Sequence, residues 1–228
     1  MLNKLKKILI VCAHPDDEVI GCGGTISLLS KTAQIDLLVF TNGEGSRKFS
    51  SDEQYKKKTL QRKQMLQKSS KILGIKNIHQ LDFRDNQLDT YPLLEITKEL
   101  ENYLKKYKPD TIFTHYKNDL NIDHRKVFEA VITATRPFKN TFIKNLLSFE
   151  ITSSTELSYS KNQFNPNFFV DIKDKINLKK KSLKIYKKQF DKELGLLTIE
   201  NIINLAKYRG SYIGSKYAEA FEIVRIII

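Results

Sequence analysis

The chain contains little of what several specialised protein classes depend on. It has only two cysteines among 228 residues, Cys12 and Cys22, which are too few for a disulfide framework, so we expect a reducing, cytoplasmic environment. No apolar run is long enough to span a membrane, and we expect no targeting segment. Internal repeats, low-complexity linkers and clear domain boundaries are also absent, so we expect a single domain over residues 1–228.

Acidic residues are in deficit as well. The 39 lysines and arginines outnumber the 26 aspartates and glutamates, which gives a formal net charge of +13. Such an excess is typical of nucleic-acid binding, but lysine runs such as 56–58 lack the interleaved aromatic residues of a single-strand binder. We therefore expect no nucleic-acid partner. A basic rim that attracts an anionic small substrate is the more specific alternative to a merely solvated surface.

The polar residues that are present gather in one short stretch. Residues 13–18 read Ala-His-Pro-Asp-Asp-Glu and follow the apolar run 7–12, which is predicted to be a buried strand. Open α/β sheets bind ligands at the carboxyl ends of strands, and unpartnered buried carboxylates are costly. The stretch therefore favours a divalent-metal site over a solvated helix start. The glycines at 21–24 lack the G-x-G-x-x-G spacing of a dinucleotide site.

Strand and helix patterns alternate through the first half of the chain, which predicts an α/β fold with a parallel sheet. The second half is less regular, and it ends in an apolar run. Strands are expected at 7–12, 34–40, 78–81, 111–115, 146–151, 168–172 and 220–228. Helices are expected from Thr25 after a glycine-rich turn, and at 53–73, 93–107, 126–135, 175–192 and 199–208. In the helix at 93–107, Leu94, Tyr103, Leu104 and Tyr107 are expected to face inward.

A second polar loop follows the strand at 111–115. Asp123 suits the start of the next helix, with His124 in its first turn, so His124 is expected at the same sheet edge as His14 and Asp17. These three residues would form an N/O site for zinc or a similar divalent metal, with a position left for water. Asp16 would then handle protons, and Asp123 would take part in catalysis or orient a ring nitrogen of a ligand histidine.

These residues resemble the motifs of the PIG-L (LmbE-like) metal-dependent N-deacetylases. Residues 13–18 and the glycines that follow match the first signature of the family, Asp123-His124 matches the end of the second, and weaker likeness continues to 217–221. The resemblance implies a Rossmann-like, mostly parallel sheet with helices on both faces. It implies a zinc-dependent hydrolase that removes the acetyl group from an N-acetylated amino sugar. It assigns His14, Asp17 and His124 as metal ligands and Asp16 as the general base.

The substrate residues are less firmly marked by the resemblance. Arg62 lies where the family often has a substrate-contacting arginine, and we expect Asn42, Glu44 and Arg209 to bind substrate with it. Asn121 stands where many members have a histidine that steadies the oxyanion. An amide donates a hydrogen bond but no proton, so Asp16 would act as both base and acid. The Asn121 departure is the main support for the alternative, a non-catalytic sugar- or nucleotide-binding module that retains the fold.

The remaining candidates have structural explanations. His79 lies in a short strand without a partner motif and is expected to be structural. His115 ends the strand at 111–115, close enough to the site that a role as a further metal ligand stays open. Glu18 is expected to fix the loop rather than bind the metal.

Overall fold

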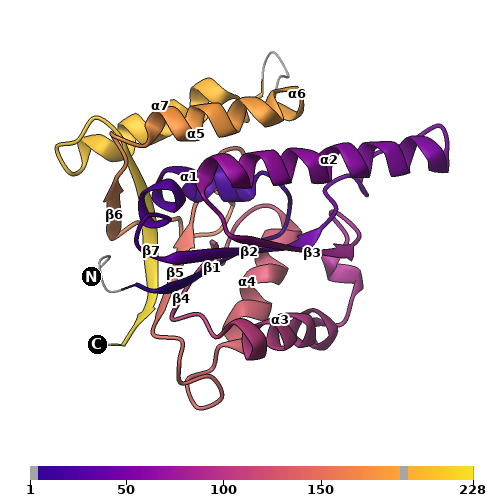
Figure 1. The fold of residues 1–228 in the computed structure, drawn as a ribbon, viewed down its shortest axis with the longest axis horizontal. Helices are drawn as coiled ribbons and strands as arrows, with labels where there is room; N and C mark the ends of the chain where they lie inside the picture. The colour runs from indigo at the N-terminus through magenta and orange to yellow at the C-terminus, as the bar shows by residue number, and fades with distance from the viewer. Residues whose placement is uncertain (1–4, 191–194, 228) are drawn as a thin grey trace.

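A seven-stranded sheet with the order β3-β2-β1-β4-β5-β7-β6 lies at the centre of the computed structural model, which describes residues 5–190 and 195–227 (Figure 1). The strands are β1 (Lys7–Cys12), β2 (Gln34–Thr41), β3 (Asn77–Phe83), β4 (Thr111–His115), β5 (Asn145–Phe149), β6 (Phe168–Asp171) and β7 (Ala218–Ile226). The first five are parallel, whereas β7 runs antiparallel to both β5 and β6. The expectation of a mostly parallel α/β sheet is confirmed.

Helices cover both faces of this sheet. They are α1 (Asp17–Leu29), α2 (Asp52–Leu73), α3 (Leu93–Tyr107), α4 (Ile122–Ala134), α5 (Ile176–Leu183), α6 (Lys187–Phe190) and α7 (Ile199–Ser211), with 3-10 turns η2 (Leu88–Thr90) and η3 (Lys184–Tyr186). In Figure 1, α3 and α4 lie on one side of the sheet, and α1, α2, α5 and α7 lie on the other. No helix in the described ranges is long and apolar enough to cross a membrane.

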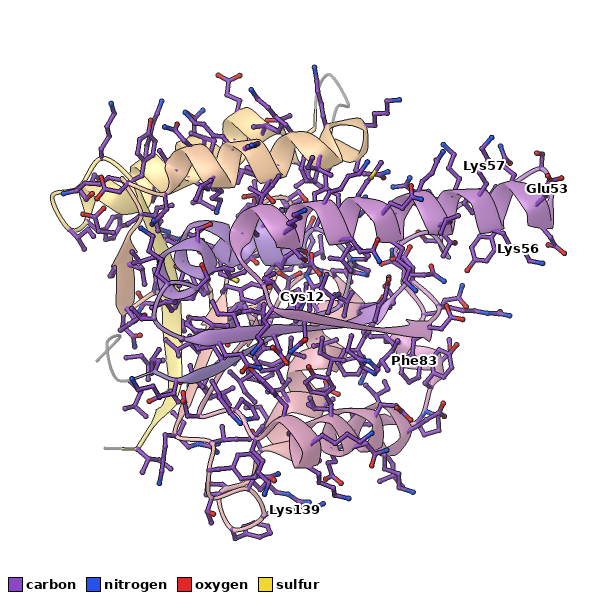
Figure 2. The ribbon with its side chains drawn as sticks, in the orientation of Figure 1. Cys12, Glu53, Lys56, Lys57, Phe83 and Lys139 are labelled. Carbon is purple, nitrogen blue, oxygen red and sulfur yellow. The ribbon has the colours of Figure 1, made fainter. Side chains whose placement is uncertain are left out.

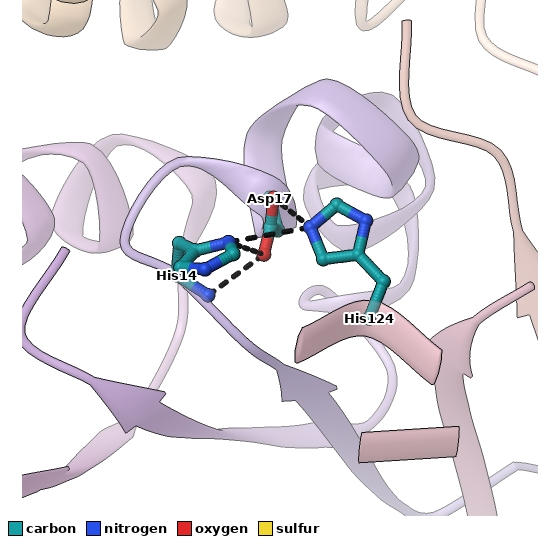
Figure 3. Close-up of side chains that lie close together, drawn as sticks. All are labelled: His14, Asp17 and His124. Atoms are coloured by element: carbon teal, nitrogen blue, oxygen red, sulfur yellow. Dashed lines mark hydrogen bonds and ion pairs between the residues drawn. The ribbon is translucent and has the colours of Figure 1, made fainter. Parts of the chain in front are cut away.

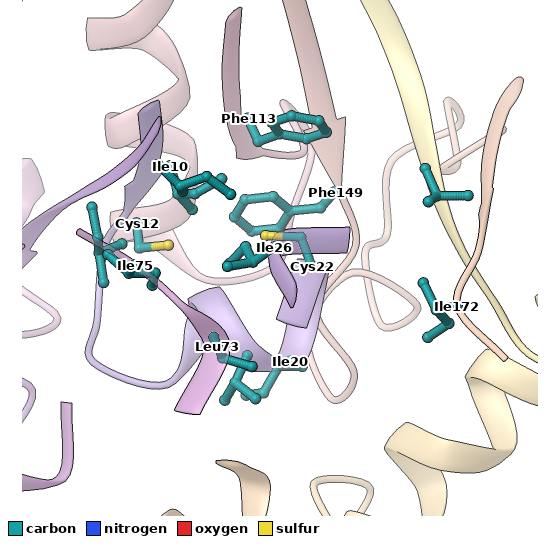
Figure 4. Close-up of a cluster of buried hydrophobic side chains, with 14 of the residues drawn as sticks. Ile10, Cys12, Ile20, Cys22, Ile26, Leu73, Ile75, Phe113, Phe149 and Ile172 are labelled. Atoms are coloured by element: carbon teal, nitrogen blue, oxygen red, sulfur yellow. The ribbon is translucent and has the colours of Figure 1, made fainter. Parts of the chain in front are cut away.

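Two hydrophobic clusters hold the layers together, one on each face of the sheet. Figure 4 shows the first cluster, where Phe149 of β5 lies near Cys22 and Ile26 of α1. The strands β4 and β5 are buried along their whole length. Burial on both faces explains why these strands read as continuous apolar runs rather than as an alternating pattern.

The prediction of a glycine-rich turn before Thr25 is wrong. The helix α1 begins at Asp17 and continues through the glycines, with a kink at Cys22, where φ is −146° and ψ is 23°. A Cβ atom at Gly24 would approach Ile172 to 2.7 Å. The absence of a side chain therefore lets α1 pack closely against the chain beyond β6, and no turn is needed there.

The structure corrects other boundaries as well. The helix α4 begins at Ile122 with Asn121 as its N-cap, so Asp123 lies within the first turn instead of opening the helix. Leu94 is 64% exposed and does not face inward, whereas Leu104 and Tyr107 are buried as expected. The helix α2 ends at Leu73 as predicted, and it is followed by Gly74, whose φ of 84° suits a residue without a Cβ atom.

The second half differs most from the sequence-based prediction. The helix expected at 175–192 is divided into α5, η3 and α6, and residues 191 and 192 lie outside the described residues. β5 ends at Phe149 rather than at 151. The last strand begins at Ala218, and residue 228 lies outside the described residues. Short elements are set by tertiary packing, so local patterns place their ends poorly.

Candidate metal centre

The loop that follows β1 is tightly folded. Asp16 has a φ of 127°, an uncommon conformation for a residue with a side chain, and it is the residue that precedes α1. The backbone N–H of His14 donates to Oδ2 of Asp17 at 2.8 Å. Glu18 accepts a hydrogen bond from the Asp16 N–H at 2.9 Å. This folding turns the carboxylates of Asp16 and Asp17 toward different partners.

His14, Asp17 and His124 meet at the carboxyl edge of the sheet, from the β1 loop and the first turns of α1 and α4 (Figure 3). Nδ1 of His14 lies 3.2 Å from Nε2 of His124 and 3.5 Å from Oδ2 of Asp17. Nε2 of His124 lies 3.5 Å from Oδ1 of Asp17. Two ligands of a tetrahedral zinc, each bonded at about 2.0–2.1 Å, are about 3.3–3.4 Å apart. The donor types and their spacing therefore fit a divalent metal.

The charges around these donors also favour a cation. Burial alone would lower the pKa of His124, but the negative charges of Asp17 and Asp119 outweigh it and raise that pKa to about 9. The site therefore attracts positive charge, which either a proton or a metal ion supplies.

Carboxylates hold the far nitrogens of both histidines. Asp123 lies 3.0 Å from Nε2 of His14 and is itself held by the backbone N–H of Asn86 at 2.6 Å. Asp85 lies 3.1 Å from the same nitrogen. A proton on Nε2 accounts for both contacts and leaves Nδ1 free to face Asp17 and His124. The structure thus places Asp123 beside His14, as expected for a residue that orients a ligand ring.

Two acidic residues at the centre were missed by sequence reasoning. Asp119 lies 3.0 Å from Nδ1 of His124 and accepts a hydrogen bond from Thr155 at 2.5 Å. Asp85 lies 3.1 Å from Nε2 of His14 and contacts that ring in the same way. Each follows a strand that ends at the same edge, β4 and β3 respectively, and this position was the only signal available in the sequence.

Asp16 lies beside this donor set and has a different partner. Its Oδ2 accepts a hydrogen bond from Nη2 of Arg62 at 2.7 Å. Burial raises the pKa of Asp16 to about 6, although the charge of Arg62 opposes the rise. Arg62 is only 4% exposed. The structure therefore places Arg62 where it holds Asp16.

The carboxylate of Glu18 links the loop after β1 to side chains of α2 and η3. It is fully buried, and it accepts hydrogen bonds from Ser69 at 2.9 Å and from Tyr186 at 3.1 Å. Burial raises the pKa of Glu18 to about 7. These contacts, together with the Asp16 N–H, agree with the expected role of fixing the loop.

His115 is buried behind the donors. Its Nε2 accepts a hydrogen bond from the Ala13 N–H at 2.9 Å, and its ring stacks on His124 with 3.9 Å between centroids. Burial lowers the pKa of His115 to about 4, so the ring is neutral. With this nitrogen engaged, His115 packs against the site rather than completing its donor set. His79 of β3 stacks on Tyr103 of α3, away from the centre, which agrees with a structural role.

The donors and Asp16 line a cleft of about 180 Å³, which Arg62 and Asn121 also line. Oδ1 of Asn121 accepts a hydrogen bond from the Asp123 N–H at 2.9 Å, and its Nδ2 donates to Oδ1 of Asn86 at 3.2 Å. The second N–H of this amide remains available at the wall of the cleft.

Three predicted substrate residues do not line this cleft. Nδ2 of Asn42 donates to Tyr55 at 2.7 Å, and its Oδ1 accepts from the Glu44 N–H at 3.0 Å. Arg209 makes two hydrogen bonds to Glu150, at 2.8 and 2.6 Å. The polar groups of Asn42 and Arg209 are thus engaged within the protein, which a sequence motif does not reveal.

The fold and this site define a metal-dependent hydrolase of the α/β class. The chain belongs to the PIG-L family: the family model described as GlcNAc-PI de-N-acetylase matches residues 9–135, more than half of its length. It is 30% identical to diacetylchitobiose deacetylase of Thermococcus kodakarensis over 97% of this chain and 84% of that protein.

Solved structures agree with this assignment. N,N'-diacetylchitobiose deacetylase from Pyrococcus horikoshii superposes with a TM-score of 0.78 at 28% identity, covering 98% of this chain and 85% of the other. GalB, a 4-carboxy-2-hydroxymuconate hydratase from Pseudomonas putida, superposes with a TM-score of 0.76 at 19% identity, covering 98% of each chain. The second likeness shows the fold alone, and the reaction must therefore be argued from the site.

Proposed function

We propose that this protein removes the acetyl group from an N-acetylated amino sugar, with zinc or a similar divalent transition metal held by His14, Asp17 and His124. The observation that carries the proposal is the triangle of donors, 3.2–3.5 Å apart, beside the carboxylate of Asp16. The family and its named deacetylase relatives support the same reaction. When bound, the metal would supply Lewis-acid activation of water and of the amide carbonyl.

The protein's own groups divide the remaining work. Asp16 takes a proton from the attacking water, and its hydrogen bond from Arg62 fixes the carboxylate in position. The free N–H of Asn121 donates to the carbonyl oxygen as negative charge develops on it. The side-chain amide of Asn121 can donate a hydrogen bond but cannot transfer a proton. Asp16 therefore passes the proton that it took from water to the leaving nitrogen. Asp123 and Asp119 act as positioning residues by holding His14 and His124.

The proposal extends to the cellular setting and the domain organisation. We place the protein in the cytoplasm, because Cys12 and Cys22 are both buried and unpaired. Residues 1–228 form one domain in this proposal, which the single continuous sheet supports within the described residues.

Acetate release from a panel of substrates tests the proposed reaction. The panel contains N-acetylglucosamine, N,N'-diacetylchitobiose and N-acetylglucosaminyl malate, with the zinc-loaded protein and the metal-free protein compared at equal concentration. We expect acetate from at least one compound, and only with metal. Absence of acetate across the panel, with one metal bound per chain, would overturn the proposal. A protein that takes up no metal would favour the sugar-binding module instead.

A further inference from the structure

A second hollow, of about 400 Å³, lies between α2, α6 and the loop after β2. We call it the basic groove. Its charged lining consists of Glu44, Arg47, Lys58, Arg62, Lys68 and Lys188. Among the described residues, five cationic side chains thus surround one carboxylate. Its other lining residues include the amides of Gln61, Gln64 and Gln189, so the wall is polar throughout much of its extent.

The basic groove adjoins the metal cleft. Arg47 and Arg62 line both of them. Arg47 reaches across from the loop after β2 to α6, where its Nη2 donates to Oε1 of Gln189 at 2.6 Å. Its Nη1 lies 3.3 Å from Glu44. A molecule whose acetamido group lay at the metal centre would therefore have the groove beside it, across these two arginines.

Within the described ranges of the chain, the groove holds more cationic groups than acidic partners. Of the residues that the structure describes, Glu44 is the single acidic residue in the lining, and it is already paired with Arg47. Arg62 uses Nη2 to hold Asp16, and in the described part of the chain neither its Nε nor its Nη1 has a hydrogen-bond acceptor. The charge of Arg62 is paired with Asp16, but this guanidinium, which is only 4% exposed, keeps two donor groups without an acceptor between the two hollows.

The lysines of the groove differ from the other lysines of α2. Lys58 and Lys68 come from α2 and Lys188 from α6, so two separate helices direct charge to one hollow. Lys56 and Lys57 instead lie at the far end of α2, where Figure 2 shows them away from the body of the protein, and they do not line the groove. A solvated surface accounts for Lys56 and Lys57, but it does not account for cations converging from two elements.

We propose that the basic groove binds an anionic group, a phosphate or a carboxylate, carried by the acetamido sugar whose acetyl group lies at the metal centre. The inference rests on the proposed deacetylase function and specifies its substrate class. The ammonium and guanidinium groups donate charge-assisted hydrogen bonds to the anion, which holds the sugar with its acetamido group toward Asp16.

A charge-matched pair of variants tests the groove. The first combines Lys58→Gln, Lys68→Gln and Lys188→Gln. The second combines Lys56→Gln, Lys57→Gln and Lys71→Gln, which removes the same charge from parts of α2 outside the groove. Deacetylation is measured with N-acetylglucosamine, its 1-phosphate and N-acetylglucosaminyl malate. We expect the groove variant to lose at least about tenfold in kcat/KM for an anionic substrate and less than about threefold for the neutral sugar.

The two anionic substrates distinguish a phosphate site from a carboxylate site. A lower kcat/KM of the groove variant for the 1-phosphate indicates a phosphate site, and a lower kcat/KM for the malate conjugate indicates a carboxylate site. An equal loss in both variants would mean that only overall charge matters, and it would overturn the proposal. An unchanged preference for anionic over neutral substrate in the groove variant would overturn it as well.

Binding separates this inference from the deacetylase proposal. Calorimetry with N-acetylglucosamine 1-phosphate and N-acetylglucosaminyl malate, each added to the metal-free protein, reports on the groove even if no acetate is released. We expect at least one of these anions to bind the parent and the control variant at least about tenfold more tightly than it binds the groove variant. If each anion bound the parent, the control variant and the groove variant with the same affinity, the groove would be excluded as an anion site, whatever the activity.

Discussion

Asp16 and Asp17 are adjacent in the chain but face different groups. Asp17 lies within 3.5 Å of donor nitrogens on both His14 and His124, whereas Asp16 pairs with Arg62 at 2.7 Å. The positive φ of Asp16 separates the two carboxylates. One therefore contributes to the donor set and the other remains beside it, as a general base requires.

Replacing each aspartate by asparagine should separate these roles. Asp16→Asn keeps all three donors, so we expect full metal content and a loss of turnover on the order of 100- to 10,000-fold. Asp17→Asn removes the anionic ligand, so we expect weaker metal retention. Metal analysis after gel filtration, together with acetate release, makes the comparison. Near-normal turnover of Asp16→Asn at full metal occupancy would show that Asp16 is not the base.

The pairing of Arg62 with Asp16 predicts a shift in pH dependence. Burial raises the pKa of Asp16 to about 6, and the positive charge of Arg62 limits that rise. A base must be deprotonated, so activity is lost as pH falls through this pKa. Arg62→Gln removes the opposing charge, so the acid limb of kcat/KM should move to higher pH than in the parent with the same metal.

Lys63→Gln provides the control for this shift, because Lys63 is exposed on the same helix. Its pH profile should match that of the parent. A limb for Arg62→Gln that stays in place, or that moves to lower pH, would contradict the assigned coupling between Arg62 and Asp16.

The helix α1 depends on a buried ion pair from distant elements. After the kink at Cys22, the backbone N–H groups of Gly24 and Thr25 donate to Glu219 of β7 at 2.8 and 2.7 Å. Lys179 of α5 lies 2.6 Å from the same carboxylate, and both side chains are at most 3% exposed. Glu219 thus caps the second half of the helix whose first turn carries Asp17.

Glu219→Gln should therefore destabilise the protein strongly. It leaves the charge of Lys179 buried without its partner, a change that typically costs about 3–5 kcal/mol in the free energy of unfolding. Urea titration measures the loss. Glu129→Gln is the matched control, because it breaks the exposed pair with Lys126 and should cost less than about 1 kcal/mol. Equal losses in the two variants would contradict the role of Glu219.

The bound metal should stabilise the whole molecule. The donors come from the β1 loop, α1 and α4, so an ion that joins them binds the folded state only. At a free metal concentration of about 100 times Kd, this linkage contributes about 2.7 kcal/mol. For a chain of this size we expect chelation to lower Tm by about 5–10 °C, as measured by differential scanning calorimetry.

Asp17→Asn is the reference for this measurement. Because it lacks one donor, its Tm should change little between chelator and added zinc. An identical response of the parent and of Asp17→Asn would show that the metal effect arises elsewhere in the protein.

The sequence by itself determined the α/β class, the parallel core of the sheet and the edge at which the polar loops meet. Those conclusions rest on local patterns: apolar runs such as 7–12, the spacing of helices, and His14 directly after a strand. The family resemblance rested on the same local motifs. Each was visible because the residues concerned are close together in the chain.

Only the tertiary structure decided which polar groups are already engaged. Asp85 with His14, Arg62 with Asp16 and Arg209 with Glu150 pair through space, and the last two pairs join residues 46 and 59 positions apart. A buried polar group needs a partner, but many residues in a chain can supply one, and sequence patterns do not choose among them. The same reason explains why the basic groove, built from α2, α6 and a loop, left no signature in the order of the residues.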